Sequence, residues 1–178
     1  MAEVLLYAPQ DFTNVCVIAR TLEAFSVSSC HVFDPNRLIR VRYGKSYTQR
    51  LRTVSAGAFF KVQWRTVSDP IGFIGQHPGR SVAISSGPGV PSLFGFALRP
   101  DDLFVFGSEA HGIPAEIAAA CSAECTIPMS GETGSLNLAV AVGIVLAEHI
   151  RQAGHDQVGG SNSRLETAAQ GARPKRIA

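Results

Sequence analysis

Short apolar runs alternate with longer amphipathic segments along residues 4–148 of the chain. Each run is four or five residues long, mostly apolar, and followed by Gly, Pro, Ser or Asp within a few positions, which is the pattern of a buried strand. The sequence predicts strands at residues 4–8, 30–33, 59–63, 81–85, 103–106 and 124–127.

The segments between these runs carry helical signals. Apolar residues at three- and four-residue steps between positions 15 and 25 form one face of a helix, with Thr13 or Asn14 as its N-cap. An Asp-Pro pair at 69–70 starts a short helix, and another is predicted over 115–121. Strands that alternate with helices predict an α/β fold, with a parallel sheet covered by helices on both faces.

The most informative stretch is residues 127–148, IPMSGETGSLNLAVAVGIVLAE. A polar loop rich in Gly and Ser follows the last predicted strand, and Ser135-Leu136-Asn137 then opens a helix of small and apolar residues. Such a helix N-terminus offers free backbone N–H groups to a ligand. The pattern alone fits a buried helix with an ordinary loop equally well. The apolar run, 12 residues at 136–147, is too short to cross a bilayer.

Composition indicates a globular protein with one domain. The 178 residues are 46% hydrophobic and 17% charged, and no basic start followed by an apolar stretch marks a leader. We expect a cytoplasmic protein without membrane contact and a domain over residues 1–153. Residues 154–178, rich in Gly, Ser, Ala, Arg and Gln, are expected to form a flexible tail in which 164–170 could add helical turns.

The four cysteines give no sign of a special site. They form no CxxC pair, and no histidine stands at ligand spacing beside them. We therefore expect buried thiols and no metal.

Positive charge is concentrated in residues 35–68, the basic segment. This segment contains eight Lys or Arg residues and no Asp or Glu, whereas the rest of the chain carries eight basic and fourteen acidic residues. Aromatic residues at positions 43, 47, 59, 60 and 64 lie between the cations, which is typical of a surface that binds phosphates and unpaired bases. The alternative is a solvated loop and strand edge. The residues predicted to bind RNA are Arg37, Arg40, Arg42, Lys45, Arg50 and Arg52.

Three polar loops follow predicted strands, at residues 85–89, 107–112 and 127–137. The carboxyl ends of parallel strands lie at one edge of the sheet, where α/β folds bind ligands, so these loops are expected to converge. The chain has no P-loop, GxGxxG or GxSxG motif, which removes the usual signals for nucleotide binding and for serine hydrolysis. His111 lies in the second loop, and a single histidine beside glycine is more typical of a structural residue than of a catalytic base.

Three separated motifs resemble those of one family. LFVFGSEAHGIP at 103–114 and the stretch at 127–148 are similar to the second and third motifs of the SpoU/TrmH branch of the SPOUT methyltransferases, and NVCVIARTLEAF at 14–25 is similar to the first. The SAGAFF segment at 55–60 also matches. The resemblance covers residues 4–152 and implies the SPOUT fold, an α/β domain with a deep C-terminal trefoil knot.

The resemblance also implies an activity. Family members bind S-adenosylmethionine in the loops of the knot, act as homodimers, and transfer the methyl group to a ribose 2′-OH of tRNA or rRNA. A residue-by-residue match places the cofactor contacts at Gly107, Ile127 and Leu136, with Ser85, Met129 and Ser135 beside them. The matched catalytic residues are Asn14, Arg20, Glu109, Ser135 and Asn137.

The chemistry of these side chains indicates their roles. Arg20 stays protonated, so we expect it to clamp a phosphate whose oxygen assists deprotonation of the hydroxyl, a poor nucleophile. The alternative for Arg20 is a surface salt bridge with Glu23 or Glu109. Glu109 and Asn137 are expected to hold the loops together through hydrogen bonds to backbone N–H groups. Asn14 is expected either to do the same or to cap its helix.

Three positions depart from the family pattern: Cys16 and Ser26 stand where Gly is usual, and Gly134 where a larger residue is common. Cys16 could narrow the approach of RNA. We expect no separate N-terminal RNA-binding domain of the kind found in many relatives, so RNA would contact the dimer surface, the basic segment and the tail. Two other functions stay open: a catalytically silent RNA-binding dimer, and a methyltransferase of the same fold that modifies a base.

Overall fold

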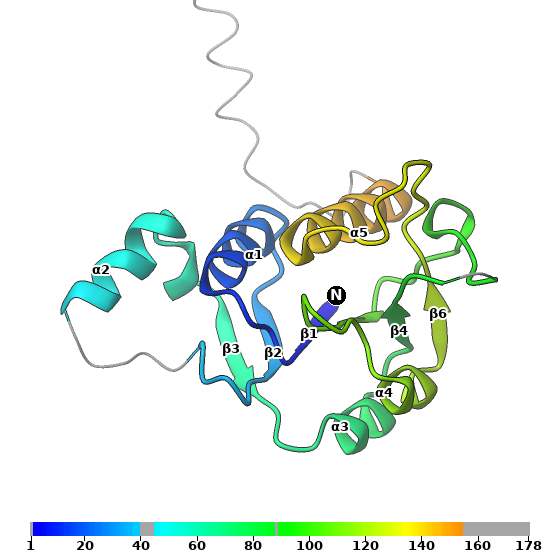
Figure 1. The fold of residues 1–178 in the computed structure, drawn as a ribbon, viewed down its shortest axis with the longest axis horizontal. Helices are drawn as coiled ribbons and strands as arrows, with labels where there is room; N and C mark the ends of the chain where they lie inside the picture. Colours follow the sequence, from blue (N-terminus) through cyan, green and yellow to red (C-terminus); the bar gives the residue numbers. More distant parts are fainter. Residues whose placement is uncertain (1, 40–44, 88, 155–178) are drawn as a thin grey trace, which may run out of the picture.

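A parallel β-sheet forms the centre of the molecule (Figure 1). The computed structural model describes residues 2–39, 45–87 and 89–154. Six strands are ordered β3-β2-β1-β5-β4-β6, and each neighbouring pair is parallel, which confirms the predicted parallel sheet. The strands are β1 (Glu3–Tyr7), β2 (Ser29–Phe33), β3 (Gln63–Thr66), β4 (Ser81–Ile84), β5 (Leu103–Phe106) and β6 (Ala123–Cys125).

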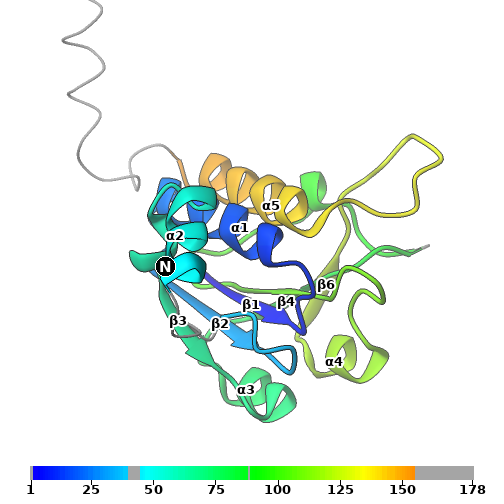
Figure 2. The same ribbon diagram turned by 60° about the vertical axis from the view of Figure 1, so that its left-hand side comes forward.

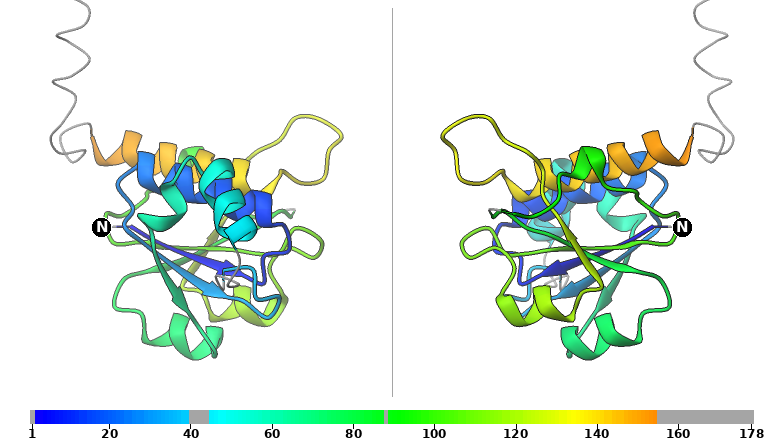
Figure 3. Two further views of the ribbon diagram at one scale, coloured as in Figure 1. Left: turned by 90° about the vertical axis from the view of Figure 1, so that its left-hand side faces the viewer. Right: turned by 90° about the vertical axis from the view of Figure 1, so that its right-hand side faces the viewer.

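Helices cover both faces of this sheet, as predicted (Figures 2 and 3). Alternate residues of the central strands point to opposite faces and supply two cores. Val4 and Leu6 belong to the larger core, and Leu5 belongs to the smaller one. On the larger core lie α1 (Phe12–Ala24), α2 (Lys45–Val54) and α5 (Leu138–Ala153), and on the smaller one α3 (Pro70–Gln76) and α4 (Ala115–Ala120).

Helix α1 begins earlier than its sequence predicts. Asp11 is the N-cap, and its Oδ1 accepts a hydrogen bond from the N–H of Thr13 at 2.6 Å. The prediction of Thr13 or Asn14 as the cap is therefore wrong, because both lie inside the first turn. Beyond the helix, Ser26 adopts a left-handed conformation (φ 58°), and the N–H of Val27 bonds back to the last turn at 2.8 Å. This conformation explains why glycine is usual at position 26.

The basic segment folds differently from the prediction. Part of it forms helix α2. The predicted strand at 59–63 is wrong except for its last residue, because Ala58–Phe60 forms a 3₁₀ turn, η1, and β3 begins only at Gln63. Ala56 (φ 51°) and Gly57 (φ 82°) turn the chain through the left-handed region. The Oγ of Ser55 accepts a hydrogen bond from the backbone of η1 at 3.2 Å. These contacts coil the chain before it joins the edge of the sheet.

The segment after β6 is bonded to the connection between β4 and β5. The N–H of Thr126 donates to the carbonyl of Pro91 at 2.9 Å, and the carbonyl of Thr126 accepts from the N–H of Leu93 at 2.8 Å. Farther along, the side chain of Gln152 in α5 donates to the carbonyl of Phe96 at 3.0 Å. The β4–β5 connection thus contacts the last segment of the fold at two separate points.

Some predictions fall on residues outside the described ranges. These are the tail from residue 155 onward, with the helical turns at 164–170, and two cations, Arg40 and Arg42. Helix α5 ends at Ala153, the predicted domain boundary. In the described part of the chain, no helix is long and apolar enough to cross a membrane. The same residues include no cluster of three His, Cys, Asp or Glu side chains that could hold a metal ion.

Candidate active site

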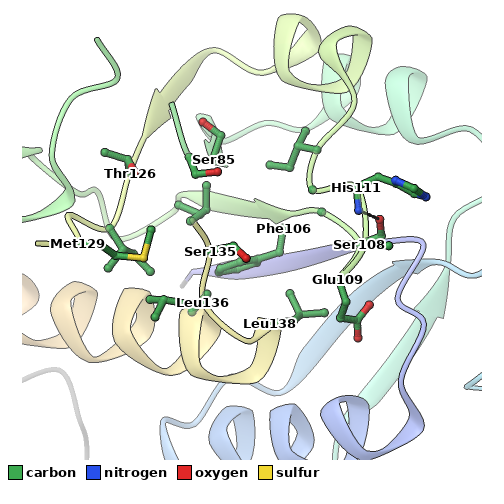
Figure 4. Close-up of a pocket in the computed structure, with 18 residues that line it drawn as sticks. Ser85, Phe106, Ser108, Glu109, His111, Thr126, Met129, Ser135, Leu136 and Leu138 are labelled. Atoms are coloured by element: carbon green, nitrogen blue, oxygen red, sulfur yellow. Dashed lines mark hydrogen bonds between the residues drawn. The ribbon is translucent and has the colours of Figure 1, made fainter. Parts of the chain in front are cut away.

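A cavity of about 350 Å³ opens at the carboxyl ends of β4, β5 and β6 (Figure 4). Its walls come from the three polar loops, so the predicted convergence of these loops is observed. Its volume is within the range of small-ligand sites, which measure about 300–1,000 Å³. All six residues matched to cofactor contacts line this cavity: Ser85, Gly107, Ile127, Met129, Ser135 and Leu136.

The loop after β5 closes tightly on itself. Ser108 and Gly112 exchange two backbone hydrogen bonds, at 3.0 and 2.9 Å. A Cβ at Gly107 would lie 1.9 Å from the carbonyl carbon of Gly112, a distance that no side chain can accept. Gly112 has φ 64°, which favours glycine there as well. The two glycines therefore shape the wall of the cavity independently of any ligand.

Glu109 ties this loop to the start of α1. Its Oε2 accepts from the N–H of Gln10 at 2.8 Å. Its Oε1 accepts from the N–H of Asp11 at 3.2 Å and from Nδ2 of Asn14 at 2.8 Å. Glu109 accepts from backbone N–H groups as expected, but these groups belong to the start of α1 and not to another of the predicted loops. With three donors on one carboxylate, Glu109 is oriented as a structural acceptor at the rim of the cavity.

Asn14 continues the network to α5. Its Oδ1 accepts a hydrogen bond from Nδ2 of Asn137 at 2.9 Å. The Oδ1 of Asn137 then accepts from the N–H groups of Ala139 and Val140 at 2.9 and 3.3 Å, which makes Asn137 the N-cap of α5. A single chain of hydrogen bonds, from Glu109 through Asn14 to Asn137, therefore connects the β5 loop, α1 and α5 beside the cavity.

Several polar groups on the cavity wall have no partner within the described residues. The backbone N–H groups of Ile127, Met129 and Leu136 donate no hydrogen bond there, and neither does the hydroxyl of Ser135. Ser85 differs, because its hydroxyl donates to the carboxylate of Glu124 on β6. Three lining residues with apolar side chains thus leave backbone donors without a partner among the described residues.

Arg20 lies away from this cavity. It is exposed on α1 and is not among the lining residues. The alternative of a salt bridge is not observed, because Glu23 pairs with Lys61 at 2.6 Å and Glu109 is occupied by its three donors. Among the described residues Arg20 has no hydrogen-bond or ion-pair partner. The structure therefore brings four of the five matched catalytic residues together and leaves Arg20 apart.

Three of the predicted RNA-binding residues lie on the surface. Arg37, Arg50 and Arg52 are exposed, and Lys45 is the first residue of α2. The guanidinium of Arg50 lies over the ring of Phe12 on α1, 5.2 Å from its centroid. This contact places Arg50 beside α1, the helix that carries Asn14.

Cys16 does not restrict the approach of RNA. Its side chain is fully buried in the core under α1, so the expectation based on its departure from the family pattern is wrong. Burial raises the pKa of this thiol to about 11, and it stays protonated at neutral pH. Cys30 and Cys125 are buried too, as expected, and Cys121 is half-buried.

Thr126 and His111 are among the residues that line the cavity but were not predicted as site residues. Thr126 follows β6 and His111 lies at the rim, where its ring projects away from Ser85 and Ser135 (Figure 4). His111 stood in a recognised motif, so its position at the rim could have been inferred, whereas nothing in the sequence marks Thr126. The assignment of His111 as a structural residue stays a prediction.

Comparison with known proteins identifies the family. The sequence profile of the SpoU rRNA Methylase family matches residues 1–147. The tRNA (cytidine(34)-2'-O)-methyltransferase of Ancylobacter novellus is 26% identical over 157 residues, which cover 84% of this chain and 91% of that protein. The protein with the same description from Beijerinckia indica subsp. indica is 37% identical over 76 residues, 43% of this chain and 48% of that protein. The latter match thus spans about half the length of the relative.

A solved structure agrees with these matches. A protein studied for 2-OH methylation of C/U34 on tRNA is 30% identical and superimposes with a TM-score of 0.72, over 86% of this chain and 96% of that chain. The profile match covers the strands, α1 and the three loops of the cavity together, with most of α5. The chain therefore belongs to the SpoU rRNA Methylase family.

Proposed function

We propose that this protein is an S-adenosylmethionine-dependent RNA methyltransferase that transfers a methyl group to a ribose 2′-OH of tRNA or rRNA. The observation that carries the proposal is the cavity itself, because six matched residues line it and the Glu109–Asn14–Asn137 network borders it. Two relatives are named as tRNA (cytidine(34)-2'-O)-methyltransferases, which supports a ribose hydroxyl as the acceptor. The protein acts in the cytoplasm, where these RNAs occur.

The cavity residues fit the cofactor. The free backbone N–H groups of Ile127, Met129 and Leu136 suit the hydrogen-bonding edge of an adenine, while their side chains supply apolar walls for the ring. Gly107 and Ser85 complete the wall opposite. S-adenosylmethionine supplies an electrophilic methyl group when it is bound there.

The remaining residues position the acceptor. A ribose hydroxyl is a poor nucleophile and must lose its proton as it attacks. The guanidinium of Arg20 binds a phosphate of the RNA through charge-assisted hydrogen bonds and places one of its oxygens next to the hydroxyl as the proton acceptor. The free hydroxyl of Ser135 hydrogen-bonds the ribose at the mouth of the cavity. Glu109, Asn14 and Asn137 hold the loops in the geometry that this requires.

We further propose that the chain is knotted at its C-terminal end, and that residues 1–153 form the catalytic domain with 154–178 as a separate tail. The hydrogen bonds of Thr126 to Pro91 and Leu93, and of Gln152 to Phe96, support a β4–β5 connection that encircles the segment between β6 and α5. The loop at the start of α5 projects from the body of the protein (Figure 3).

A homodimer would complete the active site. Val17 on α1 and Val140 on α5 are 39% and 49% exposed, although the two helices pack side by side. Arg20 is exposed three residues beyond Val17, on the same side of α1. A second copy on this face covers the apolar side chains and brings Arg20 to the cavity of its partner. Mixing an Arg20→Ala protein with a Gly107→Ala protein should then restore part of the activity that each lacks alone.

Calorimetry tests the cofactor proposal. Wild-type protein is expected to bind S-adenosylmethionine with one site per chain, and Arg20→Ala to bind it within a few-fold of wild type while losing methyl transfer. No measurable binding by wild type would favour a catalytically silent RNA-binding dimer. A large loss of cofactor affinity in Arg20→Ala would show that the role assigned to Arg20 is wrong.

A further inference from the structure

Phe60 is an aromatic residue of the basic segment whose ring is presented to solvent. Phe59 is buried and Trp64 half-buried, whereas Phe60 is 44% exposed at the end of η1. The guanidinium of Arg52, on α2, lies over this ring at 5.3 Å from its centroid. Both groups are flat and exposed, and both stack favourably on nucleobases.

The Phe60 ring is held in place from the protein side. Phe59 contacts it edge-on, with 5.6 Å between the ring centroids, and stacks on Trp64 at 5.0 Å. The indole N–H of Trp64 donates to the carbonyl of Phe59 at 2.9 Å, and the buried hydroxyl of Ser55 accepts from the N–H of Phe59. The backbone that carries Phe60 is therefore fixed before any partner arrives, which lowers the entropic cost of binding.

The electrostatic surroundings favour a polyanion over a protein surface. The basic segment has no acidic residue, and its cations Arg50, Arg52, Lys61 and Arg65 are exposed. Of these cations, Lys61 forms an ion pair with Glu23 on α1, with 2.6 Å between Nζ and Oε1. A group of cations without acidic residues attracts a polyanion, and exposed rings flanked by cations are typical of single-stranded nucleic-acid sites.

The same ion pair connects the residue after this ring to the helix that carries Arg20. Lys61 follows Phe60 directly, and its partner Glu23 is three residues beyond Arg20 on α1, about one helical turn. An RNA strand whose phosphate is held by Arg20 would continue along α1 toward Lys61 and meet the Phe60 ring. The ring therefore lies where a nucleotide near the modified one would pass.

We propose that Phe60 and Arg52 form a stacking site for one unpaired base of the RNA substrate. The proposal rests on the proposed function, because it takes RNA as the substrate and Arg20 as its phosphate clamp. It assigns to Phe60 a specificity role: the protein selects RNA in which the nucleotides near the target are unpaired, such as a loop, over continuous duplex.

The experiment compares two fluorescent RNA probes by anisotropy at one fixed salt concentration: a hairpin with a single-stranded loop, and a blunt duplex with the same number of phosphates. Phe60→Ala is expected to weaken binding of the hairpin about tenfold and to leave binding of the duplex unchanged, since stacking of one base contributes about 1–3 kcal/mol. Arg52→Ala is expected to weaken binding of both probes and to reduce the slope of log affinity against log salt concentration by about one. Arg52→Lys should restore the affinity for the duplex but not the affinity for the hairpin.

Ile71→Ala is the matched control, because Ile71 is 48% exposed on α3, on the other face of the sheet. If Phe60→Ala loses affinity equally for both probes, or for neither, the stacking site is overturned. A change in the monomer–dimer equilibrium of Phe60→Ala, measured by sedimentation, would instead make this ring a protein contact. Binding needs no methyl transfer, so a wild type that binds the hairpin through Phe60 without methylating RNA would contradict the proposed function and leave the stacking site intact.

Discussion

Asn14 is predicted to be the residue on which the active-site network depends most. It is 7% exposed and joins two elements, donating to Glu109 at 2.8 Å and accepting from Asn137 at 2.9 Å. A hydrogen bond to a charged group contributes about 1.5–3 kcal/mol and a neutral one about 1 kcal/mol. Asn14→Ala should therefore lower the free energy of unfolding by about 3 kcal/mol.

Urea denaturation at one protein concentration measures this loss, and a fixed concentration is needed because a dimer gains stability by mass action. Thr13→Ala is the control, because the Thr13 side chain is exposed on the same turn and makes no hydrogen bond within the described residues. It should change stability by no more than about 0.5 kcal/mol.

A double-mutant cycle then isolates the bond between Asn14 and Asn137. The coupling free energy should be about 1 kcal/mol, since the two side chains are in direct contact. A value near zero, together with an Asn14→Ala protein as stable as the Thr13→Ala control, would refute the claim that this network holds the loops. Cofactor affinity measured on the same proteins should fall in the same order as stability.

Three further changes test the local geometry. Gly107→Ala should cost about 3 kcal/mol or more because its Cβ would overlap the backbone, whereas Gly75→Ala, with open space around the new methyl, should be neutral or stabilising in the same melting assay. Ser26→Gly should raise the stability by about 1 kcal/mol by relieving a left-handed residue, and a lower melting temperature would contradict this. A hydrogen bond from Arg151 lowers the pKa of Glu148 to about 2, so the stabilisation by Glu148 is complete above its usual pKa and is lost as the pH falls toward 2. The cost of Glu148→Gln should be about 1–2 kcal/mol at pH 7 and should shrink on acidification in pH-dependent denaturation, and a constant cost would rule out this linkage.

The sequence predicted the parts of this protein that follow regular patterns. The alternation of strands and helices predicted the parallel sheet. Continuous apolar runs of four or five residues indicated strands buried on both faces, which requires helices on both sides of the sheet. The three loops were predicted to converge since parallel strands end at one edge, and all of them line the cavity. The order of the motifs identified the family, which the profile match confirms.

The predictions that failed depend on tertiary contacts. The segment after Ser55 looked like a strand, but the left-handed turn at Ala56 and Gly57 coils it, and no local pattern marks that turn. Cys16 was assigned to the RNA side because a helical position alone does not say which face the core covers. The hydrogen bond that joins Glu109 to Asn14 spans 95 residues of sequence, and no local pattern predicted it.

The central claim is that the acceptor is a ribose hydroxyl of RNA. The most direct test is to incubate total tRNA and rRNA with the protein and S-adenosylmethionine labelled in its methyl group, and then to hydrolyse the RNA with alkali. A methyl group on the 2′-oxygen blocks cleavage of the adjacent phosphodiester, so the label should appear in alkali-resistant dinucleotides and be absent with Arg20→Ala. Label recovered in mononucleotides would mean that a base is methylated, and no label in RNA would contradict the account as a whole.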